Sequence, residues 1–248
     1  MRCRTADLEW SRQKAVLERL ALTVGLVTFF IAGYFGVGYV ADPTRGWELA
    51  TPLDDQIPFV ARSVWVYLWA FPAALLPLFV VRCPRLLRRT ALAYATVIAV
   101  SLVCFAAFPV TVARFRVDSA MLDISRPSDW AVSVVYALAP PCNCFPSLHL
   151  SITALAAFST WKASRPLGAA AFLGVGLVGV SVCTVKQHFL PDPLGGLALA
   201  ALVDALILRP YDPRLCEMPA YTWRGPVIYM GFLVLVYAGF YVAFLWAL

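Results

Sequence analysis

Two histidines are the most distinctive residues of this chain, because imidazole is the side chain that titrates nearest neutral pH. His149 ends the segment Cys142-Asn-Cys-Phe-Pro-Ser-Leu-His149, and His188 lies within Lys186-Gln-His-Phe-Leu-Pro-Asp192. The 248-residue chain has no further histidine. Any acid–base or nucleophilic step that needs imidazole at neutral pH must therefore use one or both of them.

His188 and Asp192 are four residues apart, a spacing that puts two side chains on one face of a helix. A carboxylate bonded to one imidazole nitrogen fixes the tautomer and leaves the other nitrogen free to attack or to accept a proton. Pro191 is typical of the first turn of a helix, so the pair is expected where a loop meets a helix. The alternative is a pair that only caps that helix.

Ser147 precedes an apolar stretch and is expected at the N-cap or in the first turn of a helix. A helix N-terminus offers unpaired N–H groups and a positive dipole end, which suit a phosphate. Lys186, Arg114 and Arg116 lie in segments next to the same edge and are candidates to coordinate phosphate oxygens. The alternatives are plain capping for Ser147 and contact with lipid headgroups for Arg116.

Metal binding is the rival chemistry. Cys142, Cys144, His149 and His188 could supply soft ligands, but their spacing matches no familiar zinc pattern. We therefore expect no metal and no cofactor. A disulfide between Cys142 and Cys144 is left open.

The rest of the sequence predicts a membrane-embedded scaffold. It is 61% hydrophobic and 14% charged, which excludes a disordered chain and an ordinary soluble domain. Seven stretches approach the roughly 20 apolar residues of a spanning helix: 20–40, 60–81, 90–110, 147–161, 167–185, 190–208 and 226–248. The predicted fold is an all-α, polytopic transmembrane bundle, a six-helix core plus a seventh C-terminal span.

Basic residues indicate the orientation of these spans. Most Lys and Arg residues fall in segments that are cytoplasmic if the N-terminus is cytoplasmic, as the positive-inside rule requires. The net charge of +6 then reflects topology, and no nucleic-acid partner is expected. The predicted division is a cytoplasmic N-terminus (1–19), a catalytic core (20–208), a cytoplasmic loop (209–225) and the seventh helix (226–248). Both histidines and the C-terminus then lie on the extracytoplasmic side, periplasmic or lumenal.

The motifs resemble those of the type 2 phosphatidic acid phosphatase superfamily. The matching residues are Pro146-Ser-Leu-His149 and the His188-x-x-x-Asp192 pair, and the resemblance covers roughly residues 20–208. Pro52-Leu-Asp-Asp-Gln-Ile-Pro-Phe59, followed by Val64-Trp-Val-Tyr67, is similar to a branch that includes inositol phosphorylceramide synthase-like proteins. Leu148, where many phosphatases have glycine, is shared with that branch.

The resemblance implies a metal-free, two-step phosphoryl transfer. His188 would form a phosphohistidine, Asp192 would orient it, and His149 would protonate the leaving group. Ser147 and nearby N–H groups would hold phosphate oxygens, and basic residues would stabilise the transferring charge.

Two of the family's motifs are altered. Val182 follows Ser181 where the family commonly has arginine, so Lys186 is expected to supply the missing charge. Position 107 is alanine where the first motif usually has lysine, which leaves Arg114 as the first candidate for that motif's arginine and Arg116 as the second.

These observations favour a lipid phosphatase, in which water resolves the phosphohistidine. The first alternative is a lipid phosphotransferase of the phosphorylceramide synthase type, in which an alcohol resolves it; the second is a transporter or scaffold with a decayed site. The expected partners are a lipid phosphate substrate and membrane lipids, and the sequence is compatible with a homo-oligomer. The seventh span is assigned to packing or dimerisation.

Overall fold

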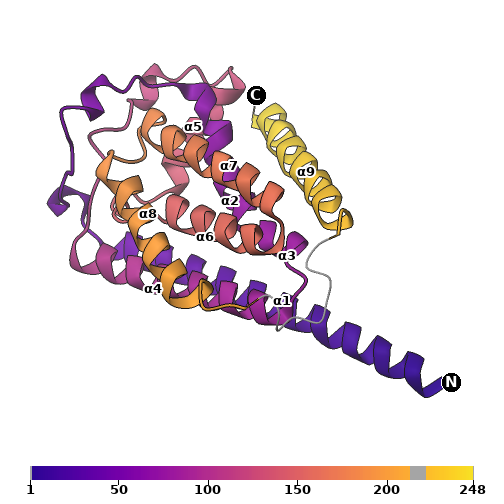
Figure 1. Ribbon diagram of the computed structural model, residues 1–248. Coiled ribbons are helices and arrows are strands. Elements are labelled where there is room, and N and C mark those ends of the chain that lie inside the picture. Colours follow the sequence, from indigo (N-terminus) through magenta and orange to yellow (C-terminus); the bar gives the residue numbers. More distant parts are fainter. Residues whose placement is uncertain (1, 213–221, 248) are drawn as a thin grey trace.

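The computed structural model describes residues 2–212 and 222–247, with side chains from residue 13 onward, and it is built of helices (Figure 1). The α-helices are α1 (Arg2–Val40), α2 (Val64–Ala74), α3 (Leu76–Val80), α4 (Pro84–Ala107), α5 (Pro127–Leu138), α6 (Leu148–Ala163), α7 (Arg165–Thr184), α8 (Pro191–Val203) and α9 (Arg224–Ala247). Short 3₁₀ turns lie at Pro43–Arg45, Asp54–Gln56, Ala61–Ser63 and Ser119–Met121, and a π turn at Asp204–Leu208 continues α8. The all-helical prediction is confirmed.

Among the described residues, five helical segments are long and apolar enough to cross a membrane: Gln13–Val40, Pro84–Ala107, Arg165–Thr184, Pro191–Leu208 and Arg224–Ala247. They are consistent with an integral, multi-pass membrane protein. The expected six-plus-one count is not confirmed, because the stretches 60–81 and 147–161 form shorter helices.

The stretch 60–81 is broken into α2 and α3 at Leu75. Pro72 lies inside α2, and Pro77 lies in the first turn of α3. Proline has no N–H for the helical ladder and is tolerated in a first turn, so the pair of prolines explains why one helix ends and another begins.

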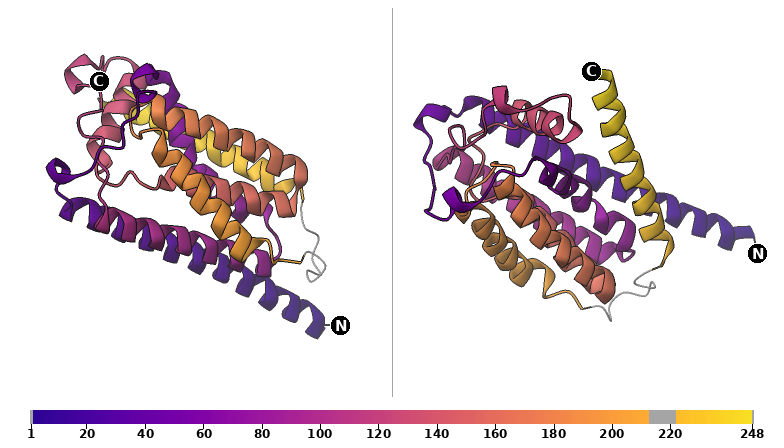
Figure 2. Two further views of the ribbon diagram at one scale, coloured as in Figure 1. Left: turned by 60° about the vertical axis from the view of Figure 1, so that its left-hand side comes forward. Right: turned by 90° about the horizontal axis from the view of Figure 1, so that it is seen from above.

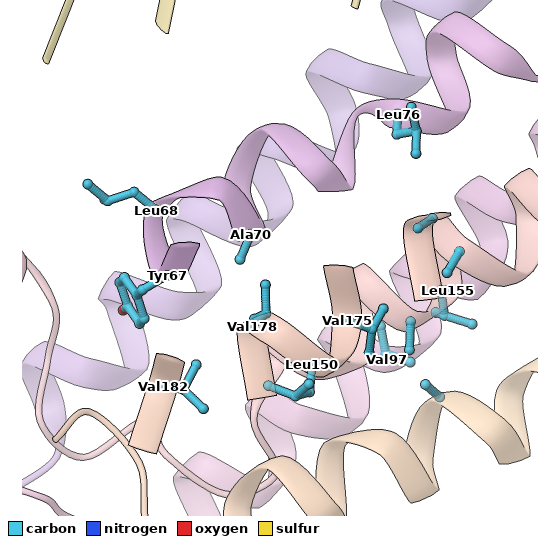
Figure 3. Close-up of a cluster of buried hydrophobic side chains, with 14 of the residues drawn as sticks. Tyr67, Leu68, Ala70, Leu76, Val97, Leu150, Leu155, Val175, Val178 and Val182 are labelled. Carbon is cyan, nitrogen blue, oxygen red and sulfur yellow. The ribbon is translucent and has the colours of Figure 1, made fainter. Parts of the chain in front are cut away.

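Helix α6, with only 16 residues, forms the centre of the bundle. It contacts α2, α3, α4, α7 and α8, and most of its residues are buried. Its small residues, such as Ser151, Ala154 and Ala157, permit the close backbone approach on which helix association in lipid depends. Figure 3 shows Leu150 and Leu155 of α6 among labelled side chains of α2, α4 and α7 in the buried cluster.

The long loops gather at one end of the bundle (Figures 1 and 2). Isolated β-bridges join Trp47 to Val110 and Val110 to Asn143. Three loop segments that are distant in the sequence therefore lie side by side. The region 111–146, which contains none of the seven predicted apolar stretches, contains α5. Pro127 at its start and Asp129 in its first turn are ordinary helix-start signals that the sequence interpretation passed over.

Helices α1 and α9 lie at the periphery. α1 packs on α4, and α9 packs on α3 and α5. The Arg19 guanidinium donates to the carbonyls of Leu78 and Val81, each at 2.8 Å, which ties α1 to the α3–α4 connection. α1 begins at Arg2, so the predicted boundary at residue 19 falls inside a continuous helix. In the predicted loop 209–225, residues 213–221 lie outside the described residues.

Candidate active site

Two chain segments bring the predicted catalytic residues together at the loop end of the bundle. His188 lies in the turn between α7 and α8, and Asp192 lies in the first turn of α8. His149 lies in the first turn of α6, directly after Ser147. The turn is anchored on α7, since the N–H groups of Gln187 and His188 both donate to the carbonyl of Val182, at 3.0 and 3.1 Å.

His188 and Asp192 form a buried pair. His188 Nδ1 lies 3.1 Å from Asp192 Oδ2, and the two residues are 3% and 0% exposed. The same oxygen accepts the N–H of Phe189 at 3.0 Å, which fixes the carboxylate. A carboxylate only accepts hydrogen bonds, so Nδ1 carries the proton and Nε2 presents a lone pair.

His188 Nε2 faces two polar groups of α6. Ser147 Oγ lies 3.2 Å away and His149 Nδ1 lies 3.3 Å away. The Ser147 hydroxyl makes no cap hydrogen bond to the α6 backbone, so the plain-capping alternative does not describe its side chain. Both α6 groups therefore border the nitrogen that is free to attack.

The start of α6 is locked to α8. The Ser147 N–H donates to the carbonyl of Asp192 at 3.0 Å, and the Ser151 hydroxyl donates to the carbonyls of Ser147 and Gly196. A Cβ at Gly196 would collide with the Ser147 carbonyl. Glycine at this position thus lets the two helices approach closely enough to bring His149 to His188.

Arg116 is occupied within the protein. Its Nη1 donates to the Tyr136 carbonyl at 2.9 Å, and its Nη2 donates to the Ala139 carbonyl and to Gln187 Oε1 at 2.8 and 2.9 Å. These bonds join the 111–117 segment to α5 and to the residue before His188. Arg116 therefore contacts protein groups. The sequence had suggested two other partners for it, phosphate oxygens or lipid headgroups.

The Lys186 ammonium is bound by the 54–57 turn. It donates to the carbonyls of Asp54 and Ile57, at 3.1 and 2.6 Å, and lies 4.3 Å from the centre of the Phe115 ring. Burial lowers the pKa of Lys186. Its backbone adopts a positive φ of 55°, an uncommon conformation for a side chain of this size, as found at strained functional turns.

Asp54 is a residue of this region that the sequence interpretation missed. It is 1% exposed, and its Oδ1 accepts the N–H of Leu190 at 2.7 Å. Its Oδ2 accepts the N–H and the hydroxyl of Thr51, each at 2.7 Å. Thr51-x-x-Asp54 has the spacing of a local side-chain-to-backbone turn, which is the signal that could have identified it. We use the name 54–186 clasp for three hydrogen bonds: those from the Lys186 ammonium to the carbonyls of Asp54 and Ile57, and the one from the Leu190 N–H to Asp54 Oδ1.

Arg114 is the exposed basic residue among the predicted phosphate ligands. Within residues 2–212 and 222–247 its guanidinium makes no hydrogen bond or ion pair, so it differs from Arg116 and Lys186 in having all its donors available.

A family model described as the PAP2 superfamily matches residues 46–206, well over half of the chain. The chain belongs to the PAP2 superfamily. No curated protein and no solved structure matched it in the same comparisons. The matched segment contains all seven predicted site residues and leaves α1 and α9 outside.

The structure also brings a thiol to this PAP2 site. Ligand atoms of Cys144, His188 and Asp192 lie within 4.8 Å of one another, a different set from the one that the sequence suggested. Burial raises the pKa of the Cys144 thiol well above its usual value, which favours the neutral form over the thiolate that binds metal. Cys142 and Cys144 are both free thiols, so the disulfide left open above is not formed in this structure.

Proposed function

We propose that this member of the PAP2 superfamily removes phosphate from a lipid phosphate at the extracytoplasmic membrane face, through a phosphohistidine on His188. The observation that carries the proposal is the environment of one atom. His188 Nε2 lies within 3.3 Å of both Ser147 Oγ and His149 Nδ1, while Nδ1 is bonded to Asp192. This arrangement suits a nucleophile with an orienting carboxylate and an adjacent acid.

In the first step His188 Nε2 attacks phosphorus. The N–P bond forms as the bond from phosphorus to the lipid oxygen breaks, and His149 transfers a proton to that oxygen. The Nδ1 proton stays on His188, where Asp192 stabilises the positive ring. In the second step the now neutral His149 takes a proton from water, the water oxygen bonds to phosphorus, and the N–P bond breaks to release phosphate.

Charge on the transferring group needs fixed donors. The Ser147 hydroxyl lies 3.2 Å from His188 Nε2 at the start of α6, and a helix N-terminus is a suitable anion site. We assign Arg114, which is exposed, as the cation that binds the phosphate. Arg116 and Lys186 act in this proposal by holding the loops that carry the site.

A specific observation favours lipid phosphotransfer as the second candidate. The segment that resembles phosphorylceramide synthase-like proteins, residues 52–59, is bonded to the catalytic turn through the 54–186 clasp. The same nucleophile and acid would serve either reaction, and only the acceptor in the second step would differ.

Purified protein in lipid vesicles, supplied with a panel of lipid phosphates and alcohol acceptors, distinguishes the candidates. The phosphatase proposal predicts release of inorganic phosphate without added acceptor, and equal activity after treatment with a chelator. A new phosphodiester lipid, detected by mass spectrometry only when an alcohol is present, would instead support the transferase. Loss of activity with the chelator and its return with zinc would overturn the metal-free mechanism.

A further inference from the structure

An apolar chamber of about 550 Å³ extends from His149 into the bundle, a volume within the usual range for small-molecule sites. Its walls come from seven α-helices of the described chain: α1, α2, α3, α4, α5, α6 and α9. His149 is part of the wall, whereas His188, Asp192 and Ser147 are not. The chamber therefore begins on the His149 side of the catalytic group.

The chamber is longer than one membrane leaflet is deep. Along α1 its lining runs from Leu22 to Phe35, about 20 Å at the ~1.5 Å rise of a helix. Half of a ~30 Å bilayer core is about 15 Å. A compact headgroup would not fill such a space, but an extended hydrocarbon chain would.

Three polar side chains of the walls are hydrogen-bonded within the protein. Thr23 donates its hydroxyl to the Arg19 carbonyl at 2.7 Å, Thr90 donates to Leu86 and Ser159, and Tyr94 donates to Ala74 at 2.8 Å. The hydroxyls of Tyr34 and Tyr67, which also line the chamber, make no hydrogen bond within the described residues, and the His149 ring packs against Tyr67 and Phe71, with centroid separations of 4.6 and 5.4 Å. Because the walls are otherwise apolar, a ligand that fills the chamber must be largely apolar and carry its reactive group beside His149.

We propose that the chamber holds the hydrocarbon chain of the lipid phosphate, and that this lipid is the leaving group. The assignment rests on the proposed function. The chain lies on the side of His149, so His149 protonates the lipid oxygen as the His188 Nε2–P bond forms and the P–O bond to the lipid breaks. The acceptor then reaches phosphorus from the loop end, which the chain does not occupy.

Part of the chamber wall lies outside residues 46–206, the segment that the family model matches. α1 supplies one side of the chamber, and Val236 and Phe240 of α9 contribute to it, although the family match covers only residues 46–206. Val27 and Ile31 line the chamber yet are 44% and 48% exposed, so the chamber is open along α1. The flanking helices α1 and α9 therefore contribute to chain selection together with the helices of the family segment.

A matched pair of substitutions on α4 tests the chamber. Ala91 lines it deep in the bundle, whereas Ala99 is exposed on the same helix. We expect Ala91→Phe to lower kcat/KM for a long-chain lipid monophosphate by roughly 10–100-fold, the scale on which a filled apolar pocket discriminates. Activity toward a short-chain analogue and a water-soluble aryl phosphate should stay near wild type, and Ala99→Phe should leave all three unchanged.

Equal losses for all three substrates in Ala91→Phe and in the milder Ala91→Leu, or no loss for any, would overturn the proposal. A binding measurement, which needs no turnover, tests the chamber proposal separately from the proposed chemistry. In a His188→Ala background, binding of a fluorescent long-chain lipid phosphate should weaken with Ala91→Phe and not with Ala99→Phe. If that binding pattern holds while wild-type protein cleaves no lipid phosphate, the catalytic proposal fails and the chamber stands; if binding is indifferent to Ala91→Phe, the chamber proposal fails.

Discussion

At the residue scale, the central feature is a single imidazole nitrogen left free by its neighbour. Asp192 accepts from both His188 Nδ1 and the Phe189 N–H through one oxygen, while its Oδ1 is buried without a partner in the described chain. The pair could be anticipated from the four-residue spacing. The contact with Ser147 could not, because it depends on how closely α8 packs against the start of α6.

Asp192→Asn is the most selective test of this pair. The amide keeps the size of the side chain but can donate to Nδ1, which favours the wrong tautomer and removes the charge that stabilises the ring. We expect kcat to fall by about 10²–10⁴-fold while the protein remains folded. Circular dichroism and size-exclusion behaviour provide the control, and a rate within a few-fold of wild type would contradict the assigned role.

The three candidate phosphate ligands fall into two groups: two are bonded to protein carbonyls, and one has its donors available for a ligand. Sequence position suggested Lys186, Arg114 and Arg116 as candidate phosphate ligands, because all three lie near the same edge. Their hydrogen bonds differ: Arg116 and Lys186 donate to protein carbonyls, and Arg114 makes no such bond within the described residues.

Arg114→Ala is therefore expected to raise KM by about tenfold, roughly 1.4 kcal/mol, through the loss of a charged phosphate contact. Arg45→Ala serves as the matched control, since Arg45 is another exposed arginine of the loop regions. Steady-state kinetics with one lipid phosphate measure both variants. An unchanged KM in Arg114→Ala, or an equal increase in the control, would remove Arg114 from the site.

At the scale of elements, the turn that carries His188 is held by a distant loop. The 54–186 clasp joins the segment before α2 to the turn between α7 and α8, and Val60 N–H adds a bond to the Thr184 carbonyl at 2.9 Å. Such long-range contacts are set by packing rather than by local pattern, which is why the segment was noticed only for its resemblance to another branch. A helix over 147–161 was expected from its apolar run. The break at Leu75 was not, although Pro72 and Pro77 are local signals for it.

Asp54→Asn tests whether the clasp positions His188. The variant weakens the contact with Leu190 N–H, so we expect kcat to fall roughly 10–100-fold with little change in KM, since Asp54 does not reach Ser147 or Arg114. Asp55→Asn is the matched control, because Asp55 is its exposed neighbour. A drop in stability with kcat unchanged in the folded fraction would limit Asp54 to a structural role.

At the scale of the whole molecule, the sequence predicted the helical class and the meeting of two distant motifs at one end. It did so because apolar runs and histidine motifs are local signals. The number of spans was less predictable, since α6, α2 and α3 are enclosed by other helices and need not meet lipid over a full bilayer depth. The chamber was not foreseen, because its wall combines side chains from helices at both ends of the sequence.

Orientation in the membrane remains a prediction of the basic-residue distribution, with the N-terminus cytoplasmic and the C-terminus outside. A reporter that fluoresces only in the cytoplasm should be silent when fused after Leu248 and active when fused before Met1. The opposite pattern would place the proposed site on the cytoplasmic face and contradict the predicted localisation.

The central claim is the covalent intermediate on His188, and rapid-quench labelling tests it most directly. Purified protein mixed with a lipid carrying radioactive phosphate should acquire an acid-labile, base-stable label that maps to the peptide containing His188. His149→Ala, which slows both steps, should not move the label to another residue, and His188→Ala should abolish it. Turnover without any labelled protein, or a label on a residue other than His188, would contradict the account.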